Sequence, residues 1–190
     1  MIRRPPRSTP KPSSAASDVY KRQNMRRLGQ RMIADGERLL RMVDNLLDTT
    51  RIEDGKLKLI SEPISLLEAV QASTAESHER ALISGINIRI QIADDLRIVA
   101  DRTTLETVLR NLMDNAIKAC TAGNGTYVEV SGKRLEGFIQ FSVQDDGLGF
   151  PPEDAAMIFE KFYRLGDELR RSTPGTGIGL YIVRQLVTLS

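Results

Sequence analysis

Residues 145–149 (DDGLG) combine two carboxylates with two glycines at the end of a predicted strand. Apolar and polar side chains alternate over residues 138–144, which is the pattern of a half-buried strand. This period of two places Asp145 on the apolar face and Asp146 on the opposite face. A carboxylate accepts hydrogen bonds, and Gly147 and Gly149 leave the backbone open to a flat ligand, so the exocyclic amino group of adenine suits the site. The alternative is a glycine-rich turn closed by an Asp side chain.

A second set of polar side chains shares one face of the helix predicted for residues 102–120, which begins at the capping residue Asp101. At about 100° per residue, Asn111, Asn115 and Lys118 fall on one side, and apolar side chains cover the other. An Asn carbonyl is a hard oxygen ligand suited to Mg²⁺, and a nearby ammonium neutralises a phosphate. The alternative is an ordinary solvated helix face.

A third segment, residues 175–179 (GTGIG), opens a predicted helix whose apolar face is formed by Ile182, Val183, Leu186 and Val187. Backbone N–H groups at a glycine-rich helix start suit anions such as the phosphates of ATP. The polar stretch 150–174 between the two glycine segments is long for a loop, which indicates either a lid or a disordered segment. Phe159 and Phe162 are its expected anchors to the body.

The remaining pattern predicts the elements that hold these segments in place. Residues 24–54 form a helix with two adjacent apolar seams, which favours a multi-helix bundle made with a second copy of the chain. An amphipathic helix packed on its own domain is the alternative. Further elements are an edge strand at 56–64, a helix at 66–82, strands at 86–92 and 96–100, and a hairpin of strands 127–131 and 138–144.

Charge and composition exclude several classes of protein. Residues 1–23 contain six basic residues and one acidic residue, a balance of +5, so the total of +2 leaves −3 for residues 24–190. A basic nucleic-acid-binding body is therefore not indicated. The proline- and serine-rich residues 1–23 predict disorder and also resemble translated sequencing-adapter sequence; a genuine basic linker is the alternative. No apolar run is long enough to span a bilayer, and the single Cys120 fits a reducing compartment.

As a set, these segments resemble the bacterial two-component sensor histidine kinases with their Bergerat-type ATP-binding domain. The segment LRNLMDNAIKA is similar to the N box of that family, VQDDGLGF to its first glycine box, IFEKFYR to its F box and GTGIGLYIV to its second glycine box. All four occur in the family's order. The segment RLLRMVDNLLDTTRIEDGKLKL resembles the second helix of the dimerisation and phosphotransfer domain and the following hinge.

The resemblance implies an α+β fold: a two-layer α/β sandwich of the Bergerat type with a mixed sheet and helices on one face, preceded by one long dimerisation helix. It implies a helix of the dimerisation domain at 24–56 and an ATP-binding catalytic domain at 57–190, in a fragment truncated at both ends. The implied function is transfer of the γ-phosphoryl group of Mg-ATP to a histidine in two-component signalling. A non-catalytic nucleotide-binding and dimerisation module, or another ATPase of the same fold, is the alternative.

The partners implied by the resemblance are ATP, a second copy bound through the 24–56 helix, and a response regulator, with no nucleic acid. The implied location is the cytoplasmic portion of a membrane-anchored bacterial sensor kinase.

The resemblance also assigns roles to individual residues. Asn115 coordinates Mg²⁺, and Asn111 and Lys118 lie near the phosphates as catalytic side chains. Asp145 holds the adenine amino group. The remaining cofactor-binding residues are Gly147 and Gly149 along the base, Lys161 and Arg164 near the γ-phosphate, and Gly175, Thr176, Gly177, Ile178, Gly179 and Leu180 in the lid hinge and phosphate cradle.

We predict that this chain does not phosphorylate itself. The phosphoacceptor histidine of the family lies on the first helix of the bundle, whereas the single histidine here, His78, lies beyond the hinge among polar neighbours that indicate a solvated surface. Incubation with γ-labelled ATP and Mg²⁺ should therefore leave the protein unlabelled. Label recovered on His78 would contradict this prediction.

Overall fold

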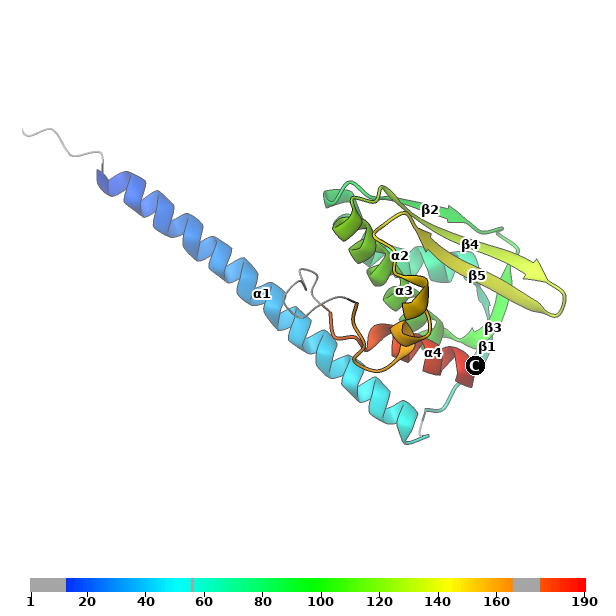
Figure 1. The fold of residues 1–190 in the computed structure, drawn as a ribbon. Coiled ribbons are helices and arrows are strands. Elements are labelled where there is room, and N and C mark those ends of the chain that lie inside the picture. The colour runs from blue at the N-terminus through cyan, green and yellow to red at the C-terminus, as the bar shows by residue number, and fades with distance from the viewer. Residues whose placement is uncertain (1–12, 56, 166–174) are drawn as a thin grey trace, which may run out of the picture. The chain divides into compact units, whose positions relative to one another are not determined.

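The computed structural model describes residues 13–55, 57–165 and 175–190 (Figure 1). The chain forms two compact units, Met1–Asp44 and Asn45–Ser190, which meet inside the first helix, α1 (Ser13–Glu53). The strands and the other helices of the described ranges all belong to the second unit. The last turns of α1 belong to it as well, so its boundary lies earlier than the one predicted between residues 56 and 57.

Helix α1 begins eleven residues before the predicted start. The prediction of disorder up to residue 23 therefore differs from the structure over residues 13–23, which are helical, whereas residues 1–12 lie outside the described residues. Pro12 is the last proline of the segment, so nothing after it removes a backbone donor or blocks the helix. The helix ends at Glu53, one residue before the predicted end, and Gly55 follows with a φ of 63°.

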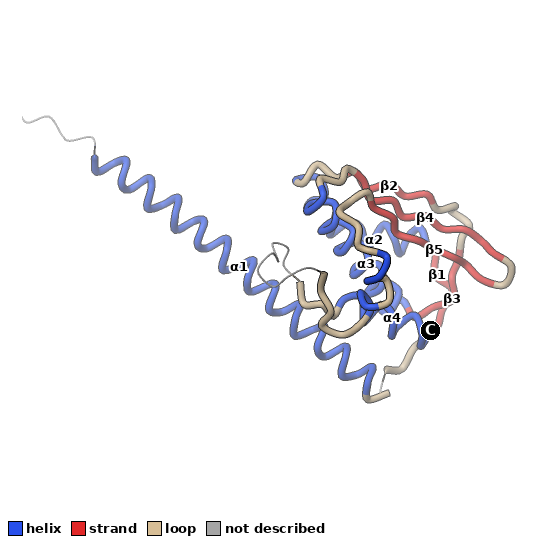
Figure 2. Tube along the Cα trace, in the orientation of Figure 1, coloured by secondary structure: helices blue, strands red, loops and turns tan. Residues whose placement is uncertain are grey.

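Two small sheets form the strand layer (Figures 1 and 2). Strands β1 (Ser61–Ser65) and β3 (Arg97–Asp101) pair antiparallel. Strand β2 (Asn87–Gln91) pairs parallel with β4 (Tyr127–Leu135). Strand β4 forms the predicted antiparallel hairpin with β5 (Phe138–Asp145) through a turn at Glu136-Gly137. The sheet is therefore mixed, as expected. Strand β1 is shorter than predicted because its partner offers only five residues for pairing.

Helices α2 (Leu66–Ile83), α3 (Arg102–Gly123) and α4 (Gly179–Leu189) lie together on one face of the mixed sheet (Figure 1). The Asp101 side chain accepts a hydrogen bond from the backbone N–H of Thr104, so the predicted cap of α3 is confirmed. Ser65 caps α2 in the same way. His78 on α2 is exposed, as predicted. None of the helices within the described ranges is both long and apolar enough to cross a membrane.

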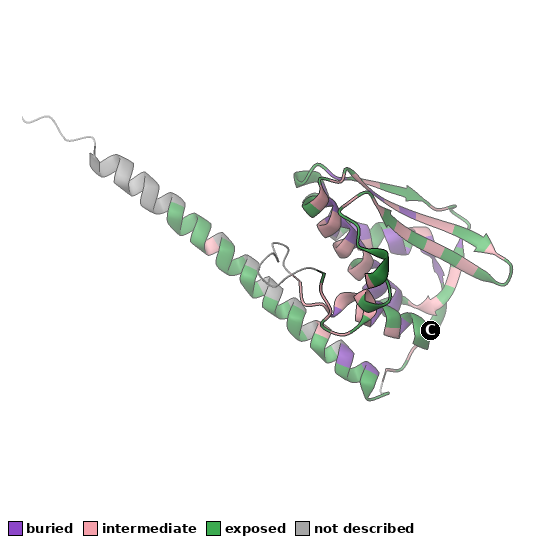
Figure 3. Ribbon diagram, in the orientation of Figure 1, coloured by how far each residue is buried: buried purple, intermediate pink, exposed green. Residues whose placement is uncertain are grey.

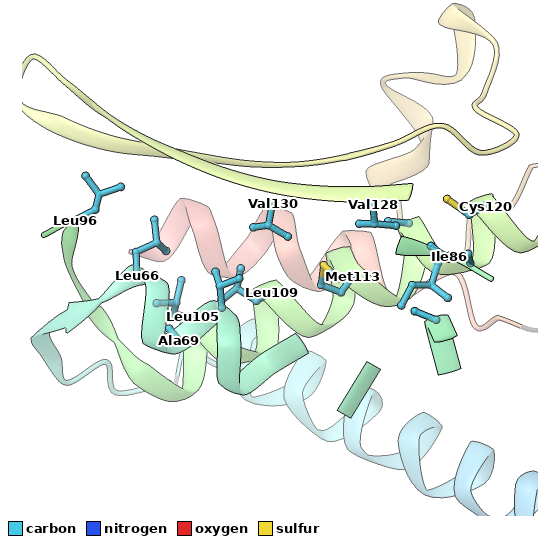
Figure 4. Close-up of a cluster of buried hydrophobic side chains, with 14 of the residues drawn as sticks. Leu66, Ala69, Ile86, Leu96, Leu105, Leu109, Met113, Cys120, Val128 and Val130 are labelled. Carbon is cyan, nitrogen blue, oxygen red and sulfur yellow. The ribbon is translucent and has the colours of Figure 1, made fainter. Parts of the chain in front are cut away.

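The main core lies between the mixed sheet and helices α2 and α3 (Figure 3). Figure 4 shows Val128 and Val130 of β4 above Leu109 and Met113 of α3, all of them fully buried or nearly so. A second cluster joins the end of α1 to α3 and α4. Its buried members are Ile52, Val108, Ile178, Ile182, Val183 and Leu186.

Two apolar side chains differ from the predicted arrangement. Val187 is 60% exposed. The helix packs through residues 182, 183 and 186, and residue 187 lies about 100° further around the axis than 186. Phe162, an expected anchor of the 150–174 loop, is 62% exposed, whereas Phe159 is half-buried in the 3₁₀ turn Met157–Phe159. Phe162 adopts a left-handed backbone conformation with a φ of 66° and bonds the rest of the protein through its backbone N–H instead.

Candidate functional site

Helix α3 has a buried apolar side and a half-buried polar side. Asn111, Asn115 and Lys118 are all half-buried, whereas Leu109 and Met113 on the other side are almost fully buried. The Asn111 side chain donates to the Thr107 carbonyl at 2.8 Å, which orients its amide group along the helix. The polar face predicted from the sequence is therefore present, and it lies at the edge of the core rather than in open solvent.

The turn formed by residues 145–149 is docked directly on the backbone of α3. The Leu148 N–H donates to the Ala119 carbonyl at 3.0 Å. A β-carbon at Gly147 would overlap the backbone of Ala119 and Cys120. Gly147 is thus required for the contact between turn and helix, a role that the sequence did not reveal. Its predicted contact with a base stays a prediction. Gly149 has open space around it and a φ of 66°.

Asp145 stands at the end of β5 with a half-buried side chain. Its Oδ1 accepts the N–H of Gly147 at 3.0 Å, so the turn is closed by an Asp side chain, as in the alternative interpretation. No hydrogen bond to Oδ2 is found in the described part of the chain. The two interpretations are therefore compatible, since one oxygen closes the turn and the other can accept from a ligand.

The second glycine segment also contacts α3. A β-carbon at Gly179, the first residue of α4, would lie 2.7 Å from Oδ1 of Asn111. Gly177 has a φ of 71°, and its carbonyl accepts the N–H of Phe162 at 2.9 Å, which ties the segment to residues 161–163. The first turn of a helix leaves backbone donors without partners within the helix, so the start of α4 presents N–H groups beside the polar face of α3.

Further residues of this segment are half-buried or buried around the helix start. Ile178 is buried, and its N–H donates to Oγ1 of Thr176 at 3.3 Å. Gly175, Thr176 and Leu180 are half-buried, and Gly175 has open space where a β-carbon would lie.

The two glycine segments contact α3 at two separate points along the helix. Gly179 lies against Asn111, and Gly147 lies against Ala119, eight residues further along the helix. At a rise of 1.5 Å per residue this separation is roughly 12 Å. Asn115 and Lys118 lie between the two points in the sequence of the helix.

Lys161 is held by a carboxylate that the sequence did not point to. Its ammonium lies 2.8 Å from Oε1 of Glu53, in the last turn of α1, and the same oxygen accepts from the Tyr181 hydroxyl at 3.1 Å. The hydrogen bonds from Lys161 and then Tyr181 lower the pKa of Glu53, while burial and then the Glu53 contact raise the pKa of Tyr181. Lys161 therefore has an anionic partner within the protein. Arg164 is half-buried nearby in the sequence.

Asp146 is a second residue near the site whose contacts the sequence did not predict. Its carboxylate accepts from the Tyr127 and Thr126 N–H groups and the Thr126 hydroxyl, and these bonds, Tyr127 first, lower its pKa to about 2. The neighbouring Cys120 thiol is buried, and burial followed by the charge of Asp145 raises its pKa to about 11. The alternation of β5 placed Asp146 outward but gave no sign of these partners, which are about 20 residues away in the chain.

Asn115 is the candidate metal ligand. The described residues hold no cluster of three or more His, Cys, Asp or Glu side chains that could bind a metal ion by themselves. The Asn115 carboxamide makes no hydrogen bond to another described residue. One hard oxygen fits Mg²⁺, which usually takes few protein ligands and completes its octahedron with water and phosphate oxygens.

Comparison with known proteins supports the ATPase fold and the family that the sequence motifs resemble. Residues 100–190 match the model of the histidine kinase-, DNA gyrase B- and HSP90-like ATPases. The sensor-like histidine kinase SenX3 of Mycolicibacterium smegmatis is 32% identical over 168 residues, which cover 85% of this chain and 42% of SenX3. The chain thus spans less than half the length of this relative.

Two solved structures show the same arrangement of elements. Full-length ShkA in complex with AMPPNP aligns with a TM-score of 0.71 and 28% identity, over 86% of this chain and 33% of ShkA. The mycobacterial sensor histidine kinase MprB aligns with a TM-score of 0.57 and 28% identity, over 68% of this chain and 80% of that structure.

We predict that Gly147→Ala destabilises the protein, because the added methyl group overlaps the backbone of α3 and forces the turn away from the helix. The expected loss is about 1–3 kcal/mol, which is the usual cost of overpacking. Urea denaturation measures the free energy of unfolding. Gly175→Ala is the matched control, since its β-carbon meets open space. Equal stability of the two variants would show that the contact between turn and helix tolerates a side chain.

Proposed function

Because the chain belongs to the histidine kinase family and contains its ATP-binding catalytic portion, we propose that this portion transfers the γ-phosphoryl group of ATP to a histidine in two-component signalling. One observation supports the assignment of the pocket most directly. Two glycine segments dock on α3 at Ala119 and Asn111, roughly 12 Å apart along the helix, and Asn115 and Lys118 lie between these points in the sequence of the helix.

In this proposal the adenine lies at the Asp145 end of the pocket. The adenine amino group donates to Oδ2 of Asp145, the oxygen that is not used to close the turn. Guanine carries a carbonyl oxygen at the corresponding position, which a carboxylate would repel. Gly149, with open space around its α-carbon, lets the base approach the backbone.

The phosphates lie at the other end, near the start of α4. Backbone N–H groups of residues 179–181 donate to phosphate oxygens there, since negative charge is favoured at a helix N-terminus. Asn111 contacts the phosphates from α3. Lys118 lies seven residues further along the helix, toward the adenine end, and its long side chain extends toward the helix N-terminus and so toward the phosphates. Lys161 and Arg164 supply positive charge near the γ-phosphate. In phosphoryl transfer, positioning and charge stabilisation do most of the catalysis.

Mg²⁺ is the proposed metal cofactor, with Asn115 as its protein ligand. The metal would supply charge neutralisation to the phosphate oxygens. The support for this assignment is the chemistry of a half-buried carboxamide without a hydrogen-bond partner among the described residues, on the helix face that the phosphates would approach.

We further propose that α1 joins two copies of the chain. Most of its large apolar side chains are exposed, although a solvated helix of this length would normally carry polar residues at such positions. These side chains are Met25, Leu28, Met32, Ile33, Leu39, Leu40, Met42, Val43, Leu46 and Leu47. Two helices from each copy, one of them preceding these residues in the intact protein, would bury them in a bundle.

The intact protein is proposed to be a membrane-anchored sensor whose cytoplasmic portion phosphorylates a response regulator. The support is that relatives such as SenX3 are sensor-like histidine kinases. Recovery of the intact protein in the membrane fraction of its cells tests the anchoring.

We predict that Asp145→Asn weakens ATP binding about tenfold or more. The amide keeps an oxygen for the Gly147 N–H but turns a donor toward the adenine amino group, and hydrogen bonds to charged groups are worth about 1.5–3 kcal/mol. Isothermal titration with ATP, with and without Mg²⁺, measures the affinity. Asp94→Asn, which changes an exposed carboxylate in a turn, is the control. Unchanged ATP affinity in Asp145→Asn would overturn the adenine assignment.

We also predict that Leu39→Ser shifts the intact protein from dimer toward monomer. Leu39 is 62% exposed, so the substitution removes apolar area from the proposed interface without opening a cavity inside one copy. Light scattering after size-exclusion chromatography gives the molar mass. Asp35→Ser, at an exposed polar position of the same helix, should keep the dimer. A monomeric intact protein would refute the interface.

A further inference from the structure

Both oxygens of the Asp146 carboxylate accept hydrogen bonds from one short segment, Thr126 and Tyr127. Its Oδ1 accepts the backbone N–H groups of Thr126 and Tyr127 at 2.8 and 2.9 Å. Its Oδ2 accepts the Thr126 hydroxyl at 2.8 Å, and the Cys120 thiol lies 3.7 Å from Oδ1. Both oxygens are therefore engaged within the protein, which leaves Asp146 poorly suited to bind a ligand itself.

The segment that holds Asp146 is itself firmly placed. Helix α3 ends at Asn124, which has a left-handed φ of 56°, and the Gly125 N–H then returns to the Cys120 carbonyl at 2.8 Å. The Thr126 carbonyl accepts the N–H of Asn87 at 2.8 Å, at the start of the parallel pairing between β2 and β4. The donors to Asp146 thus stand where a helix end and two strands meet.

Within the turn of residues 145–149, Asp146 directly follows Asp145, the residue proposed to contact adenine. Asp145 is paired with Val128 across the β4–β5 ladder, and Asp146 comes directly after that last pair. On the other side of the turn, the Leu148 N–H bonds the Ala119 carbonyl. Asp146 and Leu148 therefore fix the turn at two points, and the Asp145 carboxylate is oriented by the Gly147 N–H that lies between them.

We propose that Asp146 is a positioning residue for nucleotide binding: its contacts with Thr126 and Tyr127 fix the turn of residues 145–149 so that Asp145 presents its second oxygen to the adenine amino group. The proposal rests on the proposed function of Asp145. Loss of the anchor would let the turn rotate about the end of β5. The base end of the pocket would be disturbed, while the phosphate end, built from α3 and the start of α4, would remain.

The anchor does not change with pH near neutrality. The pKa of Asp146 is lowered to about 2, so the carboxylate stays ionised over the whole range in which a protein of this kind works. A depressed pKa contributes stability above the unfolded value near 4 and loses it as the pH falls through about 2. A variant without this carboxylate should therefore show a flatter dependence of stability on pH between about 4 and 2.

The test compares two variants at Asp146 with one at its partner. Asp146→Ala removes the anchor, whereas in Asp146→Asn the amide oxygen can still accept both N–H groups and the amide nitrogen can donate to the Thr126 hydroxyl. Thr126→Val removes only the hydroxyl donor, at an exposed position. Its ATP affinity therefore tests the role of the Asp146 contacts even if Asp146→Ala does not fold. Asp94→Ala controls for the loss of one exposed negative charge.

Binding of ATP, GTP and inorganic triphosphate is measured with Mg²⁺, well below the melting temperature of each variant. We expect Asp146→Ala to weaken ATP binding about tenfold, to reduce the preference for ATP over GTP and to leave triphosphate binding unchanged. Asp146→Asn should stay within about threefold of the natural chain, and Thr126→Val should weaken ATP binding by a smaller factor than Asp146→Ala.

The possible outcomes separate this inference from the proposed function. If Asp146→Ala and Thr126→Val melt at lower temperature but bind ATP as tightly as the natural chain, Asp146 only stabilises the fold and the inference fails. Equal weakening for ATP and triphosphate would also overturn it. If Asp145→Asn weakens ATP binding while Asp146→Ala does not, the adenine site stands and the anchor fails. A natural chain that binds no ATP overturns both.

Discussion

Backbone contact between helix α3 and the turn at residues 145–149 is the constraint on which the site depends. The helix and the turn approach so closely that residue 147 has no room for a β-carbon, and the Leu148 N–H bonds a carbonyl of the helix. Contact of this kind fixes the height of the turn above the helix more rigidly than side-chain packing would, because no rotamer can adjust it. The contact between turn and helix therefore also fixes the position of the Asp145 carboxylate.

The same helix serves both layers of the domain. Its buried side, with Leu109 and Met113, joins the mixed sheet, and its half-buried side bears the polar residues of the proposed pocket. Each glycine segment then meets α3 at a different height, so one rigid element sets the distance between the proposed adenine and phosphate ends. The end of α1 also enters this region, because Glu53 binds the F-box residue Lys161.

Local signals in the sequence predicted the elements well and the long-range contacts poorly. The Asp101 cap and the hairpin of β4 and β5 are local features, and the sequence predicted both where the structure has them. The partners of Asp146 and Glu53 could not be predicted, since 19 or more residues separate each pair and no periodicity relates them. The packing role of Gly147 was missed for the same reason: the sequence shows that a side chain is absent but not which backbone fills its place.

Hydrogen exchange of the backbone amides, measured with and without Mg-ATP, tests the account most directly. Bound nucleotide should slow exchange at residues 145–149 and in the first turn of α4, because these segments form the two ends of the proposed pocket, and GTP should have a much smaller effect at residues 145–149. Exchange that stays unchanged at both segments, or that slows equally with GTP, would contradict the central claim that helix α3 and its two docked glycine segments form an adenine nucleotide site.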